Sequence, residues 1–454
     1  MMAARSTDRP GPQTAASRDV LVLGMGVTGA SCARHLAARG HAAWFADTRA
    51  EPPGLAAIRK AMPGAGVLAG AMPATLPAGV GRIVVSPGVD LDLPVLAEAR
   101  RRGLPVLSDL DLFAAACRAP MLGITGSNGK STVTTMVGAM LSAGGWPVAV
   151  GANLGTPALD LLDAVVQAYV LELSSFQLER SAPLALKAAV VLNVAPDHLD
   201  RHGSMAAYAA AKARIYARCE VAVLNRDEPA LAAMVPPGTR IIGFSLGRPA
   251  GEDFGLVDSQ GSEWLAQGER LLLPLADLGT TGRHNVANAL AALALVAAAG
   301  GPPDTAAVLR SFHGLPHRMQ VVARARGITW IDDSKATNVA AAVTAIRGVD
   351  GPLVLIAGGD AKGQEFAELA AALQGRDAAV ILIGQDRARM AQELRGTAAV
   401  ELADTLPAAV RRASELAPAG ATVLLAPACS SLDMFRNFEH RGQVFAAAAR
   451  EVAA

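Results

Sequence analysis

The sequence is poor in aromatic residues and in cysteine, and it carries almost no net charge. Aromatic side chains make up 4% of the 454 residues while hydrophobic residues make up 52%, so alanine, leucine and valine must build most of the core. A formal net charge of +1 offers no broad basic face for nucleic acid. Anionic ligands must therefore be bound by a few individual lysines and arginines rather than by a basic surface.

The scarcity of cysteine also bears on metal sites and on location. The four cysteines lie far apart and form no C-x-x-C pair, so neither a disulfide framework nor a zinc site is expected: Cys32, Cys117, Cys219 and Cys429. No apolar run is long enough to suggest a membrane span. Residues 1–18 lack the apolar region of a signal peptide and are expected to form a flexible tail. We therefore expect a cytoplasmic protein that binds no membrane.

The length suits about three domains of ordinary size. Short Val/Ile/Leu runs alternate with longer alanine-rich helical stretches, which is typical of an α/β protein with mainly parallel sheets covered by helices. We expect two Rossmann-like domains, at 19–109 and 315–454, around a central domain at 110–314. A small antiparallel patch is expected within 252–273.

Twelve apolar runs are expected to be strands. They are residues 19–23, 42–46, 82–85, 121–124, 169–173, 188–192, 221–224, 241–244, 329–331, 353–357, 379–383 and 422–425.

The run Gly123-Ile-Thr-Gly-Ser-Asn-Gly-Lys-Ser-Thr132 follows an expected strand and opens an expected helix. It is a phosphate-binding pattern, in which glycines let backbone N–H groups approach an anion and the helix N-terminus adds its positive dipole. Lys130 can reach the terminal phosphates and Ser131 can take Mg²⁺. The loop is shorter than the full G-x-x-x-x-G-K-[ST] fingerprint, because Ile124 occupies the place of the first glycine.

A second glycine-rich turn lies near the N-terminus. Gly24-Met-Gly-Val-Thr-Gly29 follows a strand, and Asp47 stands 23 residues beyond Gly24 at the end of the next strand. Alone, this pattern fits a dinucleotide cofactor, with the acid on a ribose hydroxyl. The same loop physics serves any nucleoside diphosphate, so a dehydrogenase and a nucleotide-substrate enzyme both remain open at this point.

Further polar residues follow the central strands. Glu172 ends an apolar strand, where a second ligand for the Mg²⁺ of a phosphate loop is commonly supplied. His198 stands in an acidic loop after the next strand and is a candidate ligand for a second metal ion, although a lone histidine is usually structural. Lys212 lies on the helix that follows, where an ordinary surface lysine would look the same.

Together these residues resemble the Mur ligase family, the ATP-dependent amide-forming enzymes of peptidoglycan precursor synthesis. The resemblance covers essentially the whole chain. It is carried by ordered motifs: Gly24-Met-Gly-Val-Thr-Gly29, Ser86-Pro-Gly88, Gly126-Ser-Asn-Gly-Lys-Ser-Thr132, Glu172-Leu-Ser-Ser-Phe-Gln177, Asp197-His198, Gly282-Arg-His-Asn285, Gly314-Leu-Pro-His-Arg318, Asp333-Ser-Lys-Ala-Thr-Asn338 and Ser430-Ser-Leu-Asp-Met-Phe-Arg-Asn-Phe438.

The resemblance implies ligation of D-glutamate to UDP-N-acetylmuramoyl-L-alanine. The substrate carboxylate would attack the γ-phosphate of ATP, and the glutamate amine would convert the acyl phosphate to an amide, releasing ADP and phosphate. The implied catalytic residues are Lys130, His198, Lys212 and Arg318. Two Mg²⁺ ions are implied, with Ser131, Glu172, His198 and a carbamylated Lys212 as the metal-site residues.

The resemblance also implies the binding residues. ATP would contact Gly126, Asn128, Gly129, Lys130, Ser131, Thr132, Asn285, Arg318, Asp333 and Lys335. The nucleotide sugar would contact Val27, Thr28, Asp47, Thr48, Arg49, Ser86, Gly88, Asn153 and Phe438. D-glutamate would contact Thr337, Lys362, Ser431 and Leu432.

Three classes of function stay open from the residues. They are a ligase for D-glutamate, a related ligase for another acceptor such as L-glutamate, meso-diaminopimelate or the glutamates of folate, and a silent nucleotide-binding protein or dehydrogenase. The set Lys130, Glu172, His198, Lys212 and Lys335 argues against a silent protein, since simple binding needs no second metal site. The sequence does not fix the oligomeric state, and we expect a monomer.

Overall fold

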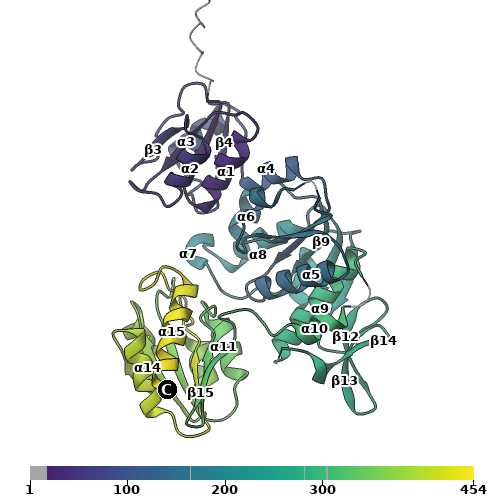
Figure 1. The fold of residues 1–454 in the computed structure, drawn as a ribbon, viewed down its shortest axis with the longest axis vertical. Coiled ribbons are helices and arrows are strands. Elements are labelled where there is room, and N and C mark those ends of the chain that lie inside the picture. Colours follow the sequence, from purple (N-terminus) through teal and green to yellow (C-terminus); the bar gives the residue numbers. More distant parts are fainter. Residues whose placement is uncertain (1–17, 164, 281, 303–304, 454) are drawn as a thin grey trace, which may run out of the picture. The chain divides into compact units, whose positions relative to one another are not determined.

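The computed structural model describes residues 18–163, 165–280, 282–302 and 305–453 (Figure 1). The expected flexible tail therefore lies, except for Arg18, outside the described residues. The described chain forms two compact units. The first comprises residues 18–118, 151–163 and 176–184, and the second comprises the remaining described residues up to 453.

The first unit is built on a five-stranded parallel sheet in the order β3-β2-β1-β4-β5. Its strands are β1 Val20–Leu23, β2 Ala43–Asp47, β3 Gly66–Ala69, β4 Arg82–Val85 and β5 Val106–Leu107. Its helices include α1 Val27–Ala37, α2 Leu55–Ala61, α3 Pro94–Arg101 and α4 Asp109–Ala116, with the 3-10 turn η1 Ala158–Leu161. The chain order reverses between β1 and β4, and open α/β sheets bind ligands at such a reversal.

The second unit contains a nine-stranded sheet in the order β14-β13-β12-β11-β10-β9-β6-β8-β7. Its strands are β6 Met121–Thr125, β7 Val148–Ala152, β8 Ala168–Glu172, β9 Leu186–Val191, β10 Cys219–Asn225, β11 Arg240–Phe244, β12 Phe254–Ser259, β13 Ser262–Gln267 and β14 Arg270–Pro274. The pairings from β8 through β6, β9 and β10 to β11 are parallel, whereas β12, β13 and β14 pair antiparallel. The antiparallel patch expected within 252–273 is thereby confirmed.

The helices in this part of the chain are α5 Lys130–Ala143, α6 Ser175–Arg180, α7 Leu199–His202, α8 Met205–Ala213, α9 Arg283–Ala298 and α10 Ala306–Ser311. Of these, α5, α9 and α10 contribute apolar side chains to the core of the sheet. Helix α9 is apolar nearly all round, because it packs against α5 and against strands β9 to β12. Helix α6 begins in this unit, and from residue 176 onward it belongs to the first unit.

A six-stranded sheet completes the second unit, in the order β15-β16-β20-β17-β18-β19. Its strands are β15 Gln320–Ala325, β16 Ile328–Asp332, β17 Leu353–Gly358, β18 Ala378–Ile383, β19 Ala399–Leu402 and β20 Thr422–Leu425, and all pairings except β15 with β16 are parallel. Its helices are α11 Val339–Arg347, α12 Ala367–Leu373, α13 Arg387–Glu393, α14 Leu406–Leu416 and α15 Phe438–Ala453.

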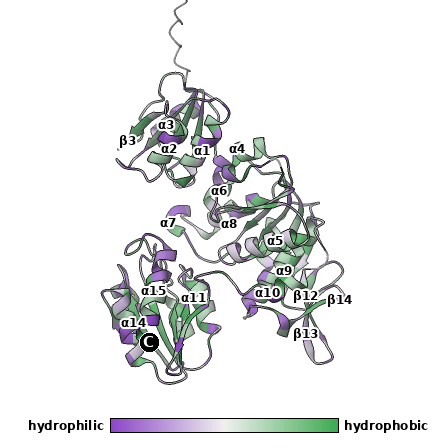
Figure 2. Ribbon diagram, viewed as in Figure 1, coloured by the Kyte–Doolittle hydropathy of each residue, from purple (hydrophilic) through white to green (hydrophobic). Residues whose placement is uncertain are grey.

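The third sheet is buried on both faces, as a doubly wound sheet must be. Along β17, Leu353 and Leu355 join the core beneath α11 and α12, whereas Val354 and Ile356 join the core beneath α14 and α15. The strands are therefore coloured as largely hydrophobic in Figure 2. This confirms the expected α/β class with mainly parallel sheets.

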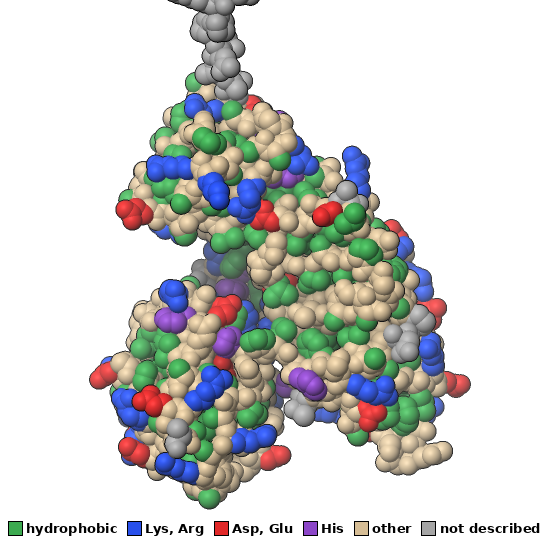
Figure 3. All heavy atoms as spheres, in the orientation of Figure 1, with side chains coloured by type: hydrophobic (Ala, Val, Ile, Leu, Met, Phe, Trp, Pro, Cys, Tyr) green, Lys and Arg blue, Asp and Glu red, His purple; other side chains and the backbone are tan. Residues whose placement is uncertain are grey.

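The surface agrees with the near-zero net charge. On the face drawn in Figure 3, acidic and basic side chains are interspersed rather than gathered by sign. In the described part of the chain, no helix is both long enough and apolar enough to cross a membrane.

Candidate functional site

A cavity of about 650 Å³ opens at the carboxyl ends of β1, β2 and β4 in the first unit. Eight of the nine residues expected to contact the nucleotide sugar line it, namely Val27, Thr28, Asp47, Thr48, Arg49, Ser86, Gly88 and Asn153. Most of these residues come from the start of α1 and from the loops after β2 and β4, whereas Asn153 follows β7. They remain candidates for binding, and their shared cavity brings them together.

The glycines of the first loop have distinct steric roles. Gly24 has φ of +97°, and a Cβ there would lie 2.8 Å from Cβ and Oγ of Ser86. A Cβ on Gly29 would lie 2.1 Å from the carbonyl oxygen of Gly24, so this glycine lets α1 pack against the loop. Helix α1 begins at Val27 without a side-chain cap, which leaves backbone N–H groups available to an anion.

The carboxylate of Asp47 is already engaged within the first unit. It accepts hydrogen bonds from the Met25 amide at 2.8 Å and from the Arg49 amide at 2.9 Å, and the Arg49 guanidinium donates to both of its oxygens. The hydrogen-bonded Arg49 side chain holds the pKa of Asp47 well below its usual range. Asp47 therefore shapes the loops and keeps Arg49 at the cavity wall.

The cavity also contains residues that were not expected from the sequence, among them Asp109 and Gln177. Asp109, the first residue of α4, is 3% exposed and lines the cavity, and burial raises the pKa of its carboxyl to about 6. Gln177 reaches the same cavity from α6, 68 residues later in the chain. Asp109 belongs to no short motif, so only the three-dimensional arrangement identifies it. Gln177 ends the motif Glu172-Leu-Ser-Ser-Phe-Gln177, but the sequence did not single it out as a cavity residue.

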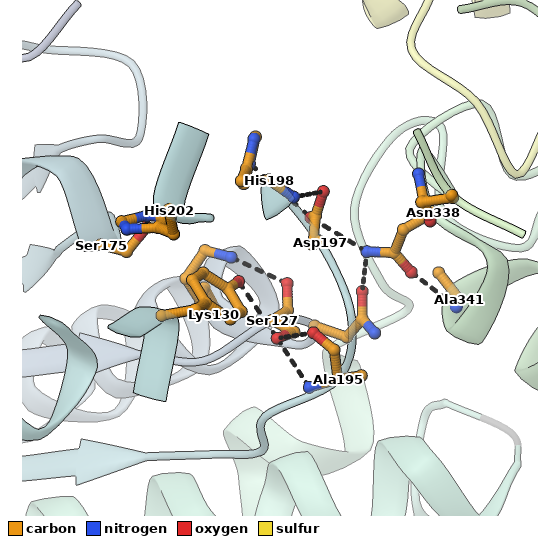
Figure 4. A network of polar contacts seen from close by, with 12 residues as sticks. Ser127, Lys130, Ser175, Ala195, Asp197, His198, His202, Asn338 and Ala341 are labelled. Atoms are coloured by element: carbon orange, nitrogen blue, oxygen red, sulfur yellow. Dashed lines mark hydrogen bonds and ion pairs between the residues drawn. The ribbon is translucent and has the colours of Figure 1, made fainter. Parts of the chain in front are cut away.

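In the second unit, the phosphate-binding pattern forms a loop between β6 and α5. Gly126 and Gly129 have φ of +154° and +82°, conformations that favour glycine. Lys130 begins α5, and its Nζ donates to the carbonyl oxygens of Gly126 at 2.8 Å and Ser127 at 2.9 Å. Figure 4 shows this lysine folded back over its own loop. Burial lowers its pKa.

Lys212 approaches the same loop from α8. It is 1% exposed, its Nζ donates to the Gly126 carbonyl at 2.8 Å, and it lies 4.4 Å from the ring centre of Tyr208. Burial, followed by repulsion from Lys130, places the pKa of Lys212 well below its usual value. Lys212 is therefore no ordinary surface lysine, and its amine is biased towards the neutral form.

The other metal-site candidates lie on neighbouring strand ends. Glu172 ends β8 and is 2% exposed, and Ser131 is buried at the start of α5. His198 follows β9 with φ of +55°, and its Nε2 lies 3.7 Å from Oδ2 of Asp197. Among the described residues, no three His, Cys, Asp or Glu side chains gather into a ready-made metal site.

A second cavity, of about 450 Å³, lies beside this loop within the second unit. Seven of the ten residues expected to contact ATP line it: Asn128, Gly129, Thr132, Asn285, Arg318, Asp333 and Lys335. Gly126, Lys130 and Ser131 are not among its lining residues, although Nη2 of Arg318 donates to Oγ of Ser131 at 3.1 Å. Arg318 thus connects the cavity to the phosphate loop.

The charged residues of this cavity are perturbed by burial. Burial raises the pKa of Asp333 to about 7 and, with repulsion from Arg318, lowers the pKa of Lys335 to about 8. Lys335 Nζ lies 3.7 Å from the ring centre of Phe438, the remaining nucleotide-sugar candidate. Phe438 does not line the 650 Å³ cavity, so its assignment to the nucleotide sugar stays a prediction.

Several polar residues of the second cavity were not expected from the sequence. Asn193 is bonded to the phosphate loop, since its Oδ1 accepts from the Asn128 amide at 2.8 Å. Asn288 donates to Oδ1 of Asn285 at 3.3 Å one helical turn away, a spacing that could have indicated it. Asn225 also lines the cavity and had no sequence signal.

The four candidates for glutamate binding lie in three loops that follow β16, β17 and β20. These loops are bonded together, since Ala428 N donates to Ala336 O at 2.9 Å and Asp360 pairs with Ser430 in an isolated bridge. Ser431 is buried, whereas Leu432 is 68% exposed. Thr337, Lys362, Ser431 and Leu432 line neither of the two cavities.

The loop after β16 also reaches the phosphate loop. Nδ2 of Asn338 donates to Oδ1 of Asn128 at 3.3 Å and to Oδ2 of Asp197 at 3.2 Å (Figure 4). These bonds join residues 210 and 141 positions apart in the sequence. Asn338 therefore links Asn128, expected to contact ATP, with Asp197, which precedes the metal candidate His198, and it follows the glutamate candidate Thr337 in the chain.

Comparison with known proteins identifies the family. The chain matches the Mur ligase MurD-like N-terminal domain over residues 18–108, the Mur ligase middle domain over 124–296 and the Mur ligase glutamate ligase domain over 317–429. It is 47% identical over 445 residues to a UDP-N-acetylmuramoylalanine–D-glutamate ligase of Nitrosococcus oceani, covering 97% of this chain and 98% of that protein. The corresponding ligase of Pseudomonas aeruginosa is 46% identical, covering 95% and 98%.

Solved structures show the same fold at lower identity. The UDP-N-acetylmuramate-alanine ligase MurC of Thermotoga maritima aligns with a TM-score of 0.61 and 19% identity, over 95% of this chain and 99% of that chain. The MurF ligase of the same organism, solved with ADP, aligns with a TM-score of 0.60 and 18% identity, over 97% and 99%. Because its sequence matches the family's three domains in order and close relatives along nearly its whole length, this chain belongs to the Mur ligase family.

Proposed function

We propose that this protein joins D-glutamate to UDP-N-acetylmuramoyl-L-alanine at the expense of ATP, in the synthesis of peptidoglycan precursors. The observation that carries the proposal is the 47% identity, over 97% of the chain, to ligases that bear this name. The two cavities support it, since one suits a nucleotide substrate and the other lies beside a phosphate loop. The proposed domains are 19–109 for the nucleotide sugar, 110–314 for ATP, and 315–454 for the amino acid together with part of the ATP site.

The proposed reaction has two steps. A carboxylate oxygen of the muramoyl-alanine substrate attacks the γ-phosphorus of ATP, so that an acyl phosphate forms and ADP leaves. The glutamate amine then attacks the acyl carbon, loses a proton, and expels inorganic phosphate as the amide forms. Catalysis of this kind rests on positioning and on neutralising charge, rather than on covalent participation of the protein.

In this proposal, Lys130 and Arg318 provide the neutralising charge. Lys130 donates hydrogen bonds to the carbonyls of its own loop, and Arg318 donates to the hydroxyl of Ser131. Incoming phosphate oxygens would take over these donors, because an anion accepts more strongly than a neutral carbonyl or hydroxyl. Lys335 would add a third cation near the nucleotide.

We also propose that the reaction uses two Mg²⁺ ions. Ser131 and Glu172 would hold one ion through hard oxygen donors, and His198 with a carbamylated Lys212 would serve the second. Carbamylation requires an unprotonated amine, and the lowered pKa of Lys212 supports that form. When bound, Mg²⁺ would neutralise the phosphate oxygens and help align them for transfer.

For the amino acid, we propose contacts from Thr337, Lys362, Ser431 and Leu432. Lys362 would pair with a carboxylate of glutamate, and its amide is fixed by a 2.9 Å hydrogen bond to Asp360. We also propose that the protein works in the cytoplasm, which its four free cysteine thiols support. We propose in addition that it acts as a monomer.

The test is ATP-dependent phosphate release with UDP-N-acetylmuramoyl-L-alanine and Mg²⁺, run with D-glutamate, with L-glutamate and without an amino acid. Release that requires D-glutamate supports the proposal, provided that mass spectrometry finds the dipeptide product. Release with L-glutamate alone would assign a different acceptor to the same machinery. Absence of release under all three conditions would contradict the ligase function.

A further inference from the structure

A short segment of the central sequence folds with the first unit. Residues 176–184 follow β8 and Glu172 by only a few positions, yet they pack with residues 18–118. Gln177, on α6, lines the 650 Å³ cavity directly. The segment therefore contributes to the proposed nucleotide-sugar site, although it carries none of the glycine-loop motifs.

Arg180, the last residue of α6, forms hydrogen bonds with the loop that lines one side of this cavity. Its Nη1 donates to the carbonyl oxygen of Pro87, and its Nη2 donates to that of Val89 at 2.5 Å. Ser86, Pro87, Gly88 and Val89 all line the cavity. One guanidinium thus fixes two alternate carbonyls of a loop that has no regular secondary structure.

The same segment also forms a hydrogen bond with α4, which contributes a residue to the cavity. The amide of Ala182 donates to Oδ1 of Asp111 at 2.8 Å. Asp111 completes the capping box of α4 with Ser108, and the first residue of that helix, Asp109, lines the cavity. The segment therefore holds both the loop after β4 and the start of α4.

These contacts have an electrostatic consequence. Carbonyl oxygens carry partial negative charge and would repel a diphosphate bound at the neighbouring loop. A guanidinium that binds two of them offsets that charge, and its planar fork restricts the loop more than a single donor could. Because the loop is fixed before the ligand arrives, less conformational entropy is lost on binding.

We propose that Arg180 is a positioning residue for the nucleotide-sugar substrate, which it serves by holding the Ser86–Val89 loop in its binding conformation. This inference rests on the proposed function of the 650 Å³ cavity. It assigns no contact between Arg180 and ATP or glutamate. Loss of Arg180 therefore weakens binding of the nucleotide sugar selectively.

The test compares Arg180→Met and Arg180→Lys with the wild-type protein by calorimetric titration of UDP-N-acetylmuramoyl-L-alanine without ATP. We expect Arg180→Met to raise Kd about 10-fold, equivalent to ~1.4 kcal/mol. Arg180→Lys should recover part of the affinity, because an ammonium can bind one carbonyl but lacks the fork. In turnover assays, KM for the nucleotide sugar should rise while KM for ATP and for D-glutamate stay unchanged.

Arg18→Met is the matched control. Arg18 also donates to a backbone carbonyl of the first unit, that of Gly64 at 2.9 Å, but Gly64 does not line the cavity. Both variants lose a guanidinium that binds backbone carbonyls of the first unit, one exposed carbonyl for Arg18 and two for Arg180. Both are therefore expected to lower thermal stability, whereas only Arg180→Met should change Kd.

An unchanged Kd in folded Arg180→Met, or an equal change in Arg18→Met, would overturn the inference. Parallel rises of KM for all three substrates would reduce Arg180 to a general structural role. Failure of the wild-type protein to bind the nucleotide sugar would instead contradict the proposed function.

Discussion

The two cavities differ in the groups that they offer to the phosphates of the proposed ligands. The 650 Å³ cavity of the first unit offers the uncapped start of α1 and glycine backbone, and its cationic side chain, Arg49, is already paired with Asp47. The 450 Å³ cavity of the second unit is lined by Arg318 and Lys335, with Lys130 on the adjoining loop. One cavity is built mainly from backbone dipoles and the other from buried charge.

This difference matches what each proposed ligand undergoes. A diphosphate that is only held needs fixed N–H groups, which cost little to maintain. A γ-phosphate that is transferred needs cations that neutralise charge developing in the transition state, and burying such cations is costly. The pKa values of Lys130, Arg318 and Lys335 are lowered because burial disfavours their charged forms. Side-chain changes should therefore damage the second cavity most, and backbone changes the first.

The largest effect is expected from removing a cation of the second unit. Lys130→Ala should lower kcat by a factor of ~1,000 or more, because the variant lacks the ammonium group that would neutralise charge on the transferred phosphoryl group. Phosphate release measures this change, and calorimetry should show that the nucleotide sugar still binds. Lys60→Ala, at an exposed lysine of α2, is the control and should retain full activity. Activity of Lys130→Ala within tenfold of wild type would refute a catalytic role.

The next effect should come from backbone geometry in the first unit. Gly24→Ala places a Cβ 2.8 Å from Ser86 at a φ of +97°, so we expect a loss of stability of ~2–3 kcal/mol and a rise of at least tenfold in Kd for the nucleotide sugar. Calorimetry and chemical denaturation measure the two quantities.

Gly40→Ala separates the clash from the backbone strain. Gly40 also has a positive φ, of +73°, but a Cβ there meets no atom within 4 Å. It should cost about 1 kcal/mol of stability without affecting ligand binding. Equal effects of the two variants on Kd would show that the first cavity does not depend on the close approach at Gly24.

A smaller effect should appear as a pH dependence of kcat/KM for ATP, which concerns the second cavity alone. The pKa of Lys335 lies near 8 in the ligand-free protein, so Lys335 loses its positive charge as the pH rises through 8. We expect kcat/KM for ATP to fall above that pH, since kcat/KM reports the free enzyme. Binding of the nucleotide sugar, measured by calorimetry, should not show this fall.

Lys335→Arg tests the assignment of that ionisation. Arginine stays protonated throughout the range, so the fall near pH 8 should disappear even if overall activity is reduced. Persistence of the fall in this variant would assign the ionisation to another group, such as Lys130 or Lys212.

The sequence predicted the interior of each sheet better than its edges. All twelve expected strands are present within two or three residues at each end, and each lies inside a sheet. The strands that were not expected outside the antiparallel patch are β3, β5, β7, β15 and β19, and every one lies at a sheet edge. An edge strand has one unpaired side and more exposure, so it needs no continuous apolar run.

The candidate site shows a similar limit. Residues within glycine loops and strand-end motifs could be named in advance, because backbone geometry demands particular residue types there. Asp109 could not, since it reaches the first cavity from a helix start outside any motif. Gln177 ends the motif Glu172–Gln177, but that motif follows the central strand β8 and gave no sign that its last residue reaches the first cavity. Asn193 and Asn225 likewise belong to the second cavity through tertiary packing alone.

The smallest predicted effect concerns backbone strain at non-glycine residues with positive φ, which occur in both units. Eight non-glycine residues among those described have positive φ, and six of them lie within or beside candidate-site loops: Ala152, His198, His317, Met319, Lys362 and Ala428. Such strain persists where the surrounding structure enforces it, and it often marks functional positions. Ala152, next to Asn153, has φ of +76°, and Ala428, in the loop before Ser431, has φ of +58°.

Ala152→Gly and Ala428→Gly should each relieve this strain and raise the free energy of unfolding by ~0.5–1 kcal/mol, net of the added entropy of the unfolded chain. Ala217→Gly, at an exposed residue with φ of −57°, should instead lower it by a similar amount. If strain positions the neighbouring ligand groups, Ala152→Gly should raise KM for the nucleotide sugar only, and Ala428→Gly should raise KM for D-glutamate only. Stabilisation without either change in KM would mean that the strain is a by-product of loop packing, and the two regions would then differ in charge but not in how their loops are held.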